Sequence, residues 1–151
     1  MKKSLTLLVA AFTMYSCGNN NANNNASSEK PTAELQYDTL CFQKVSGNSS
    51  QDTATIQLLI QGETVTGRFS NVPFEKDARV GTLSGTKKNE LIMGTWTFSQ
   101  EGMADSMQVE FKLSGNNLLQ KEYKIDSKTG REVLTGSSKF SIVFDKIRCP
   151  D

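Results

Sequence analysis

Hydrophobic and polar side chains alternate along most of the chain after Leu35, which is the pattern of strands that bury one face. The alternation is clearest in residues 54–60 and resumes in residues 65–69. Gly62-Glu63 separates the two runs with glycine first, as a type II′ hairpin turn requires. With this two-residue turn, the register that the turn imposes and the register that the apolar face demands agree. The expected cross-strand pairs are Ile60 with Val65, Leu58 with Gly67, and Ile56 with Phe69.

The same two-residue period continues towards the end of the chain, and no segment has the period of an amphipathic helix. Gly81, Gly85 and Gly94 lie inside predicted strands, where glycine indicates strong bending. Regularly spaced short strands with tight turns predict an all-β antiparallel up-and-down meander of about eight strands. We expect a closed or nearly closed barrel, with a β-sandwich as the alternative. The further predicted strands are 80–86, 91–98, 107–113, 118–125 and 138–149, with a weaker one at 131–135.

The register of the predicted strand at 118–125 depends on the turn before it. Leu119, Tyr123 and Ile125 form the more apolar face, and pointing them inward needs a three-residue loop or a bulge. A turn of four residues would instead direct Gln120 and Glu122 into the barrel. On the last strand, the residues expected to share one face are Phe140, Ile142 and Phe144.

The N-terminal segment follows a different pattern. Lys2 and Lys3 precede a short uncharged apolar run at 5–14, which is typical of a secretory leader and too short to span a membrane. The run ends in Met14-Tyr15-Ser16-Cys17, and a polar run follows at once. This segment resembles the lipobox of bacterial lipoproteins. The resemblance implies that residues 1–16 are a cleaved signal peptide and that Cys17 is lipidated; the alternative is an ordinary leader with a chance cysteine.

The segment after Cys17 predicts a tether. Residues 18–28 have no apolar side chain larger than alanine, so they cannot bury a core and should be disordered. We therefore expect a lipidated cysteine and flexible tether at 17–35 and a barrel domain at 36–151. The expected partner of Cys17 is the lipid bilayer, and the expected location is the cell envelope. Gly18 after the cysteine favours the outer over the inner membrane, by resemblance.

Two cysteines remain once Cys17 is assigned to lipid. In an oxidising compartment a disulfide between Cys41 and Cys149 is the natural pairing, with two separate buried thiols as the alternative. Cys41 lies in the first predicted strand and Cys149 at the end of the last. Their bond would join the two strands that meet when a barrel closes.

Residues 36–149 resemble the small single-domain lipoproteins common in Bacteroidota, a family without an assigned activity. The resemblance lies in strand starts and turns, so it implies a shared fold more than a shared chemistry. The barrel is also similar in outline to lipocalins, although their Gly-x-Trp signature near the first strand is missing. The matching segments are Val65-Thr66-Gly67, Phe74-Glu75-Lys76-Asp77, Gly81-Thr82-Leu83-Ser84-Gly85 and the run from Thr95 to Gly102.

Composition restricts the chemistry. The chain has no histidine, which excludes histidine-based triads and imidazole metal sites. Its net charge of +1, with both signs interspersed, argues against nucleic acid as a partner. No phosphate loop, dinucleotide fingerprint or paired-cysteine metal motif is present, so we expect no cofactor, no metal site and no catalytic residue.

These observations favour a membrane-anchored envelope lipoprotein that is an interaction or structural module and not an enzyme. The alternative is a binder of a small apolar or amphipathic ligand inside the barrel; a hydrolase is a third, weaker possibility because activating a nucleophile without histidine is uncommon. A filled barrel interior would favour the interaction module, and a cavity of several hundred Å³ would favour the ligand binder. The candidate ligand-lining residues, which serve equally well as core, are Trp96, Phe98, Phe111 and Tyr123.

Overall fold

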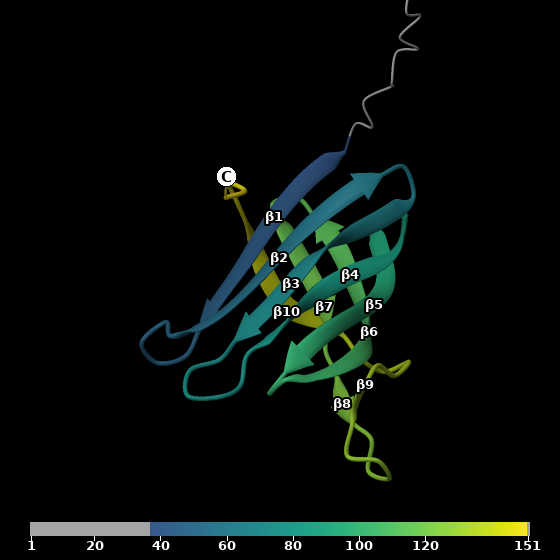
Figure 1. The fold of residues 1–151 in the computed structure, drawn as a ribbon. Coiled ribbons are helices and arrows are strands. Elements are labelled where there is room, and N and C mark those ends of the chain that lie inside the picture. The colour runs from purple at the N-terminus through teal and green to yellow at the C-terminus, as the bar shows by residue number, and fades with distance from the viewer. Residues whose placement is uncertain (1–36, 151) are drawn as a thin grey trace, which may run out of the picture. The chain divides into compact units, whose positions relative to one another are not determined.

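A computed structural model describes residues 37–150, so the predicted leader, the tether and Cys17 lie outside the described residues. The described chain is all-β and forms a closed antiparallel barrel of eight strands in meander order (Figure 1). The predicted barrel is therefore confirmed over the sandwich. No described helix is long and apolar enough to cross a membrane. The barrel strands are β1 (Asp38–Ser46), β2 (Asp52–Gln61), β3 (Thr64–Val72), β4 (Arg79–Lys88), β5 (Leu91–Gln100), β6 (Met103–Ser114), β7 (Asn117–Lys121) and β10 (Phe140–Ile147).

The first predicted hairpin is confirmed in both turn and register. Gly62 has a φ of +59°, and residues 62 and 63 alone separate β2 from β3. Leu58, Ile56 and the other inward residues of β2 are buried, as the alternation requires. The three expected pairs are all present: Ile60 with Val65, Leu58 with Gly67, and Ile56 with Phe69. In the next hairpin, of β4 and β5, Gly85 pairs with Gly94 and Leu83 with Trp96.

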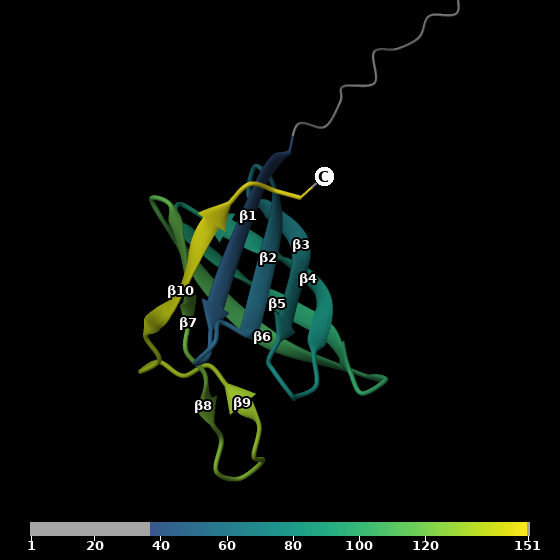
Figure 2. The same cartoon turned by 90° about the vertical axis from the view of Figure 1, so that its left-hand side faces the viewer.

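The predicted disulfide is confirmed and lies at the seam where the barrel closes. β1 pairs with β10 over three residues, of which Cys41 pairs with Ile147. Cys149, two residues beyond the end of β10, forms the disulfide with Cys41 at a Cα–Cα distance of 5.1 Å. The two strands lie side by side at the seam in Figure 2. A short ladder of backbone hydrogen bonds is thus supplemented by a covalent link.

Glycines let neighbouring strands approach closely where the barrel bends. A methyl group on Gly81 would overlap the carbonyl oxygen of Thr97 and lie 2.5 Å from the Cα of Phe98. A methyl group on Gly67 would overlap the carbonyl oxygen of Gln57. The bending that the sequence predicts from in-strand glycines is therefore realised by backbone contacts that no side chain would permit.

Aromatic side chains fill the barrel interior. The ring of Phe69 stacks on that of Trp96 with centroids 4.1 Å apart and meets the edges of Phe111 and Phe144 at 6.2 and 6.1 Å. The indole Nε1 of Trp96 donates a hydrogen bond of 3.1 Å to the backbone oxygen of Phe69, so its polar group is satisfied inside the core. Packing of this kind fixes the strands around a solid centre.

Of the two inward faces left open at 118–125, the structure has the one that includes Gln120. Ser114 pairs with Asn117 and Leu113 with Leu118, so only two residues separate β6 from β7 and the even-numbered residues of β7 face inward. Leu118 and Gln120 are consequently buried, whereas Leu119 is only half-buried on the other face. Glu122 follows the end of β7 and is also half-buried, where its carboxylate accepts a hydrogen bond from Ser141. Ile125, which belongs to the other of the two faces, is 66% exposed.

The predicted shared face of the last strand is correct for two of its three residues. A β-bulge in β10 between Phe140 and Ile142 shifts the register against β7. Phe144 is buried and Ile142 packs on the core, but Phe140 pairs with Lys121, whose ammonium lies 5.9 Å from the centre of its ring.

The weak strand predicted at 131–135 exists in part but does not belong to the barrel. β8 (Lys124–Ile125) and β9 (Glu132–Val133) form a separate two-stranded sheet. This hairpin, residues 124–133, projects below the barrel in Figures 1 and 2. The end of the barrel that carries it is called the lower mouth here.

Candidate functional site

The lower mouth is open on one side because β6 is much longer than its partner β7. β7 pairs with β6 along Phe111–Ser114, and the chain leaves the barrel after Lys121. Residues 103–109 of β6 therefore pair with β5 and, among the described residues, have no second ladder. The hairpin lies opposite this half of β6.

A tight turn shapes the tip of the hairpin. The carboxylate of Asp126 accepts hydrogen bonds from the backbone nitrogens of Lys128 and Thr129, at 2.7 and 3.1 Å. Gly130 has a φ of +70° and donates from its backbone nitrogen to the backbone oxygen of Asp126. These bonds close a turn at residues 128–130. The turn places the next two side chains, Arg131 and Glu132, towards the barrel.

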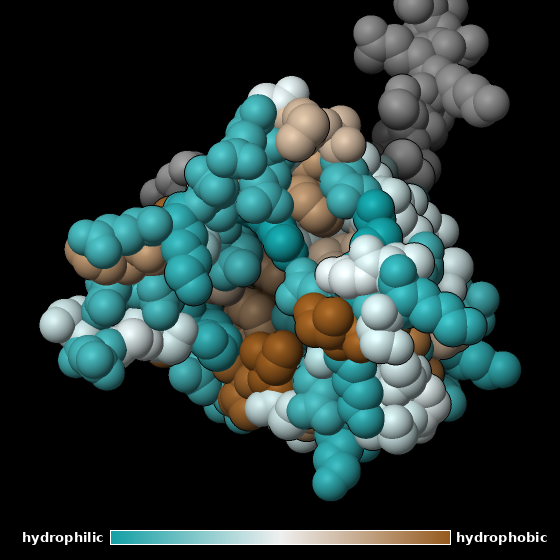
Figure 3. Space-filling view, turned by 90° about the horizontal axis from the view of Figure 1, so that it is seen from below, coloured by the Kyte–Doolittle hydropathy of each residue, from teal (hydrophilic) through white to brown (hydrophobic). Residues whose placement is uncertain are grey.

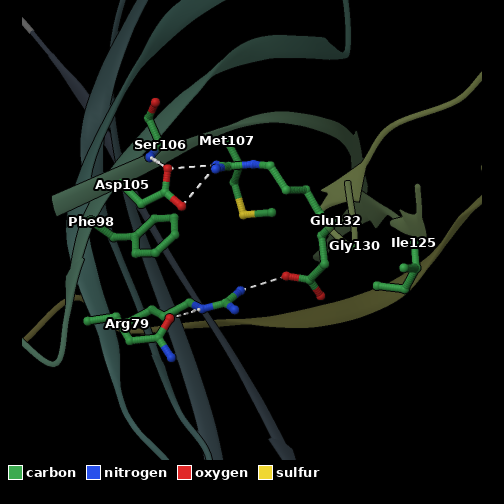
Figure 4. Close-up of a pocket in the computed structure, with 10 residues that line it drawn as sticks. Arg79, Phe98, Asp105, Ser106, Met107, Ile125, Gly130 and Glu132 are labelled. Atoms are coloured by element: carbon green, nitrogen blue, oxygen red, sulfur yellow. Dashed lines mark hydrogen bonds and ion pairs between the residues drawn. The ribbon is translucent and has the colours of Figure 1, made fainter. Parts of the chain in front are cut away.

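Two ion pairs hold the hairpin against the barrel, as Figure 4 shows. The guanidinium of Arg131 donates two hydrogen bonds to the carboxylate of Asp105 on β6, at 2.7 and 2.9 Å. The guanidinium of Arg79 on β4 donates to Glu132 at 2.6 Å and to the side-chain oxygen of Gln100 at 2.8 Å. Both pairs are partly exposed, so each contributes little to global stability, but together they define where the hairpin lies.

A mouth cleft of about 390 Å³ lies between the two ion pairs. Phe98 and Met107 point into it from the barrel, and Ile125 borders it from the hairpin (Figure 4). Seen from below, the lower end has a hollow with apolar residues at its centre and hydrophilic residues around it (Figure 3). The mouth cleft thus has an apolar centre and a charged rim.

A side cleft of about 450 Å³ continues from the mouth cleft, since the two share Ser106, Met107, Arg131 and Glu132. One wall consists of five consecutive residues of β6, and the other of four consecutive residues of the hairpin and its exit. Met93 from β5 completes the lining. The two walls are residues 106–110 and residues 131–134.

The charges around the clefts are matched in pairs. The two hydrogen bonds from Arg131, with a further one from the backbone nitrogen of Ser106, lower the pKa of Asp105 from its ordinary value. Lys121 lies 2.8 Å from Glu110 on the other side of the side cleft. The clefts therefore contain charged groups but no large excess of either sign.

Tyr123 lies where the chain leaves the barrel. Burial raises the pKa of Tyr123 to about 12, against the opposing effect of a hydrogen bond from the side-chain nitrogen of Gln120 to its hydroxyl oxygen at 3.2 Å. Gln120 is 4% exposed, and this bond gives its side-chain nitrogen a partner inside the barrel. The two side chains thus form a hydrogen-bonded pair at the edge of the core.

The candidate ligand-lining residues belong mainly to the core. Trp96 and Phe111 are buried, and Tyr123 packs on the edge of the core. Phe98 is also buried but lines the mouth cleft. The internal space next to Phe111, among side chains from β2 to β6, measures about 10 Å³, which is room for no more than a water molecule.

Two further hollows lie elsewhere on the barrel. One, of about 480 Å³, is at the upper mouth beside Leu40, Leu113 and Tyr37, the first described residue. The other, of about 350 Å³, follows the outer face next to Cys41 and Val80. Neither brings charged side chains into pairs as the lower mouth does.

Comparison of the chain with protein-family models, with curated proteins and with solved structures finds no match. The resemblance to small lipoproteins therefore stays a prediction from the sequence.

Sequence reasoning missed the residues that build the clefts: Arg79, Asp105, Arg131 and Glu132. Each lies in a segment whose hydrophobic pattern is weak, and 131–135 was interpreted as a strand of the main sheet. The available signal was the turn at Asp126–Gly130, since a tight turn followed by a short strand is what an excursion from a barrel requires.

Proposed function

We propose that this chain is a lipid-anchored envelope lipoprotein that acts by binding another macromolecule at its lower mouth, and that it is not an enzyme. The binding part rests on the difference in volume between the space inside the barrel and the clefts at its lower mouth. The internal space measures about 10 Å³, whereas the clefts at the lower mouth measure about 390 and 450 Å³. A ligand inside the barrel would have to displace closely packed aromatic rings.

The anchoring part rests on the leader and on Cys17. A protein held by several acyl chains stays in the membrane fraction, whereas one without them does not. Cys17→Ser should therefore move the protein out of the membrane fraction or leave the leader uncut. Unchanged fractionation and unchanged mass for this variant would contradict the anchor.

The binding part is tested with a photo-reactive residue introduced into the full chain in cells. Met93 is 48% exposed and lines the side cleft, so a photo-reactive residue at this position should give a covalent adduct of defined mass on illumination. In place of Thr82, an exposed residue of β4 that lines none of the clefts described above, it should give none. Adducts of equal yield from both positions would refute a specific surface at the lower mouth. A stoichiometric small molecule found by native mass spectrometry of the purified chain would instead support the ligand binder.

A further inference from the structure

We propose that the unpaired half of β6 binds an extended, uncharged segment of another protein by adding it as a further strand. This inference rests on the function proposed above and names the kind of partner that the side cleft accepts. Strand addition at an exposed sheet edge is a general mode of peptide recognition, in which backbone hydrogen bonds supply affinity and alternate side chains supply specificity.

The hydrogen-bonding direction of each β6 residue follows from the ladder. The backbone nitrogen of Leu113 donates to the backbone oxygen of Glu90, so the odd-numbered residues of β6 bond towards β5. The even-numbered residues therefore direct their backbone groups to the other side. Ser114 and Lys112 use them to pair with β7. At Gln108 these groups face the side cleft with no ladder partner in the described part of the chain.

The residues that line the side cleft also indicate that the edge of β6 faces it. Val109 is among its lining residues although its side chain is 2% exposed and points into the core. Val109 therefore lines the cleft through its backbone, as a residue on the free edge of β6 would. The β6 wall, residues 106–110, is about 14 Å long at the rise of an antiparallel strand. An extended segment of about five residues matches that length.

The character of the occupant follows from the side chains that it would meet. Met93, Met107, Val133 and Leu134 offer apolar contacts, and methionine adapts its shape to different partners. The two acidic residues that line the side cleft, Glu110 and Glu132, are already paired with Lys121 and Arg79. A charged central residue would therefore find no free counter-charge, whereas an uncharged segment with apolar residues at alternate positions would leave no charge unpaired.

The test uses the full chain in detergent and, as probe, an eight-residue peptide of alternating threonine and valine with blocked ends. Amide NMR should show a shift and slowed exchange at Gln108 on titration with the peptide. Gln108→Pro removes the edge donor without removing a bond to β5, so the barrel should stay folded. Gln108→Ala is the matched control, because both variants lose the side-chain hydrogen bond from Gln108 to Thr95.

We expect about tenfold weaker binding of the peptide to the proline variant and unchanged binding to the alanine variant. The same peptide N-methylated at every residue should not bind. Equal affinity for both variants, or no change at the Gln108 amide with millimolar peptide, would overturn the inference. A chain that is itself dimeric, and becomes monomeric in the proline variant, would show that a second copy occupies the edge and would also overturn it.

The photo-adduct at position 93 distinguishes the two proposals. If the adduct persists in a Gln108→Pro background, the lower mouth still binds a macromolecule, and strand addition alone is wrong. If the adduct is absent in the wild-type background as well, the proposed function itself fails. Loss of the adduct in the proline background, together with its retention in the alanine background, supports both.

Discussion

Replacing Gly81 with alanine tests whether the barrel needs close backbone contact between β4 and β5. The added methyl group would overlap the carbonyl oxygen of Thr97, and it would meet the Cα of Phe98 at 2.5 Å. Neither obstacle is a flexible side chain, so the two paired strands themselves must separate. Overpacking costs about 1–3 kcal/mol, and the rigid obstacle places this variant near the upper limit. Alanine also restricts the unfolded chain more than glycine does, but this offsets only about 0.4–1 kcal/mol of the lost stability.

The net loss should be about 2 kcal/mol, which lowers the melting temperature by roughly 8 °C or more in a domain of this size. Trp96, the single tryptophan, is buried against Phe69 and reports unfolding by fluorescence in urea. Gly136→Ala is the control, because a methyl group there meets nothing within 4 Å and the backbone has no positive φ. Its stability should change by less than about 0.5 kcal/mol. Equal urea midpoints for the Gly81 and Gly136 variants would refute the close-contact reasoning.

Two further predictions concern the disulfide at the closing seam and the buried Tyr123 that follows β7. The Cys41–Cys149 disulfide spans 108 residues and supports a ladder of three residue pairs, so reduction should cost up to about 4–5 kcal/mol; an unchanged urea midpoint with and without reductant would contradict this. The pKa of Tyr123 is raised to about 12, so its contribution to stability is complete below about pH 10 and is lost as the pH rises towards 12. Tyr123→Phe should lack this loss, which amounts to roughly 2–3 kcal/mol, in urea titrations between pH 9 and pH 12.

Alternation and turn chemistry were sufficient for the barrel but not for the site. The period of two in β2 and β3, with glycine first in the turn, specifies both the partner strand and the register, because a shift of one residue would expose every apolar side chain. The cysteines at the two ends add the closing contact. At 118–125 the register depended on the length of one turn, which the apolar pattern does not fix. The structure buries Leu118 and Gln120, although the more apolar face is the other one. The predicted inward position of Phe140 is wrong for a related reason, because a β-bulge cannot be recognised from the alternation of apolar and polar residues.

The clefts are harder to predict because they arise from a mismatch of lengths. β6 continues for eight residues, 103–110, beyond its ladder with β7, and nothing in either strand alone encodes that difference. Arg79, Asp105, Arg131 and Glu132 come from three separate segments, and their pairing depends on where the hairpin folds back. Charged residues on the rim of a barrel are otherwise ordinary solvated side chains in a sequence.

The lower mouth separates recognition from stability. The core, the glycine contacts and the disulfide hold the barrel together without help from the hairpin, whose two ion pairs are partly exposed and contribute little. A segment held this weakly can move at small cost, and residues 103–109 keep their ladder with β5 when it does. The gap between β6 and the hairpin leaves the backbone of Gln108 without a ladder partner, and it also gives the hairpin room to move. A strand can be added at this edge of β6 because the hairpin that would have to move aside is not needed to keep the barrel folded.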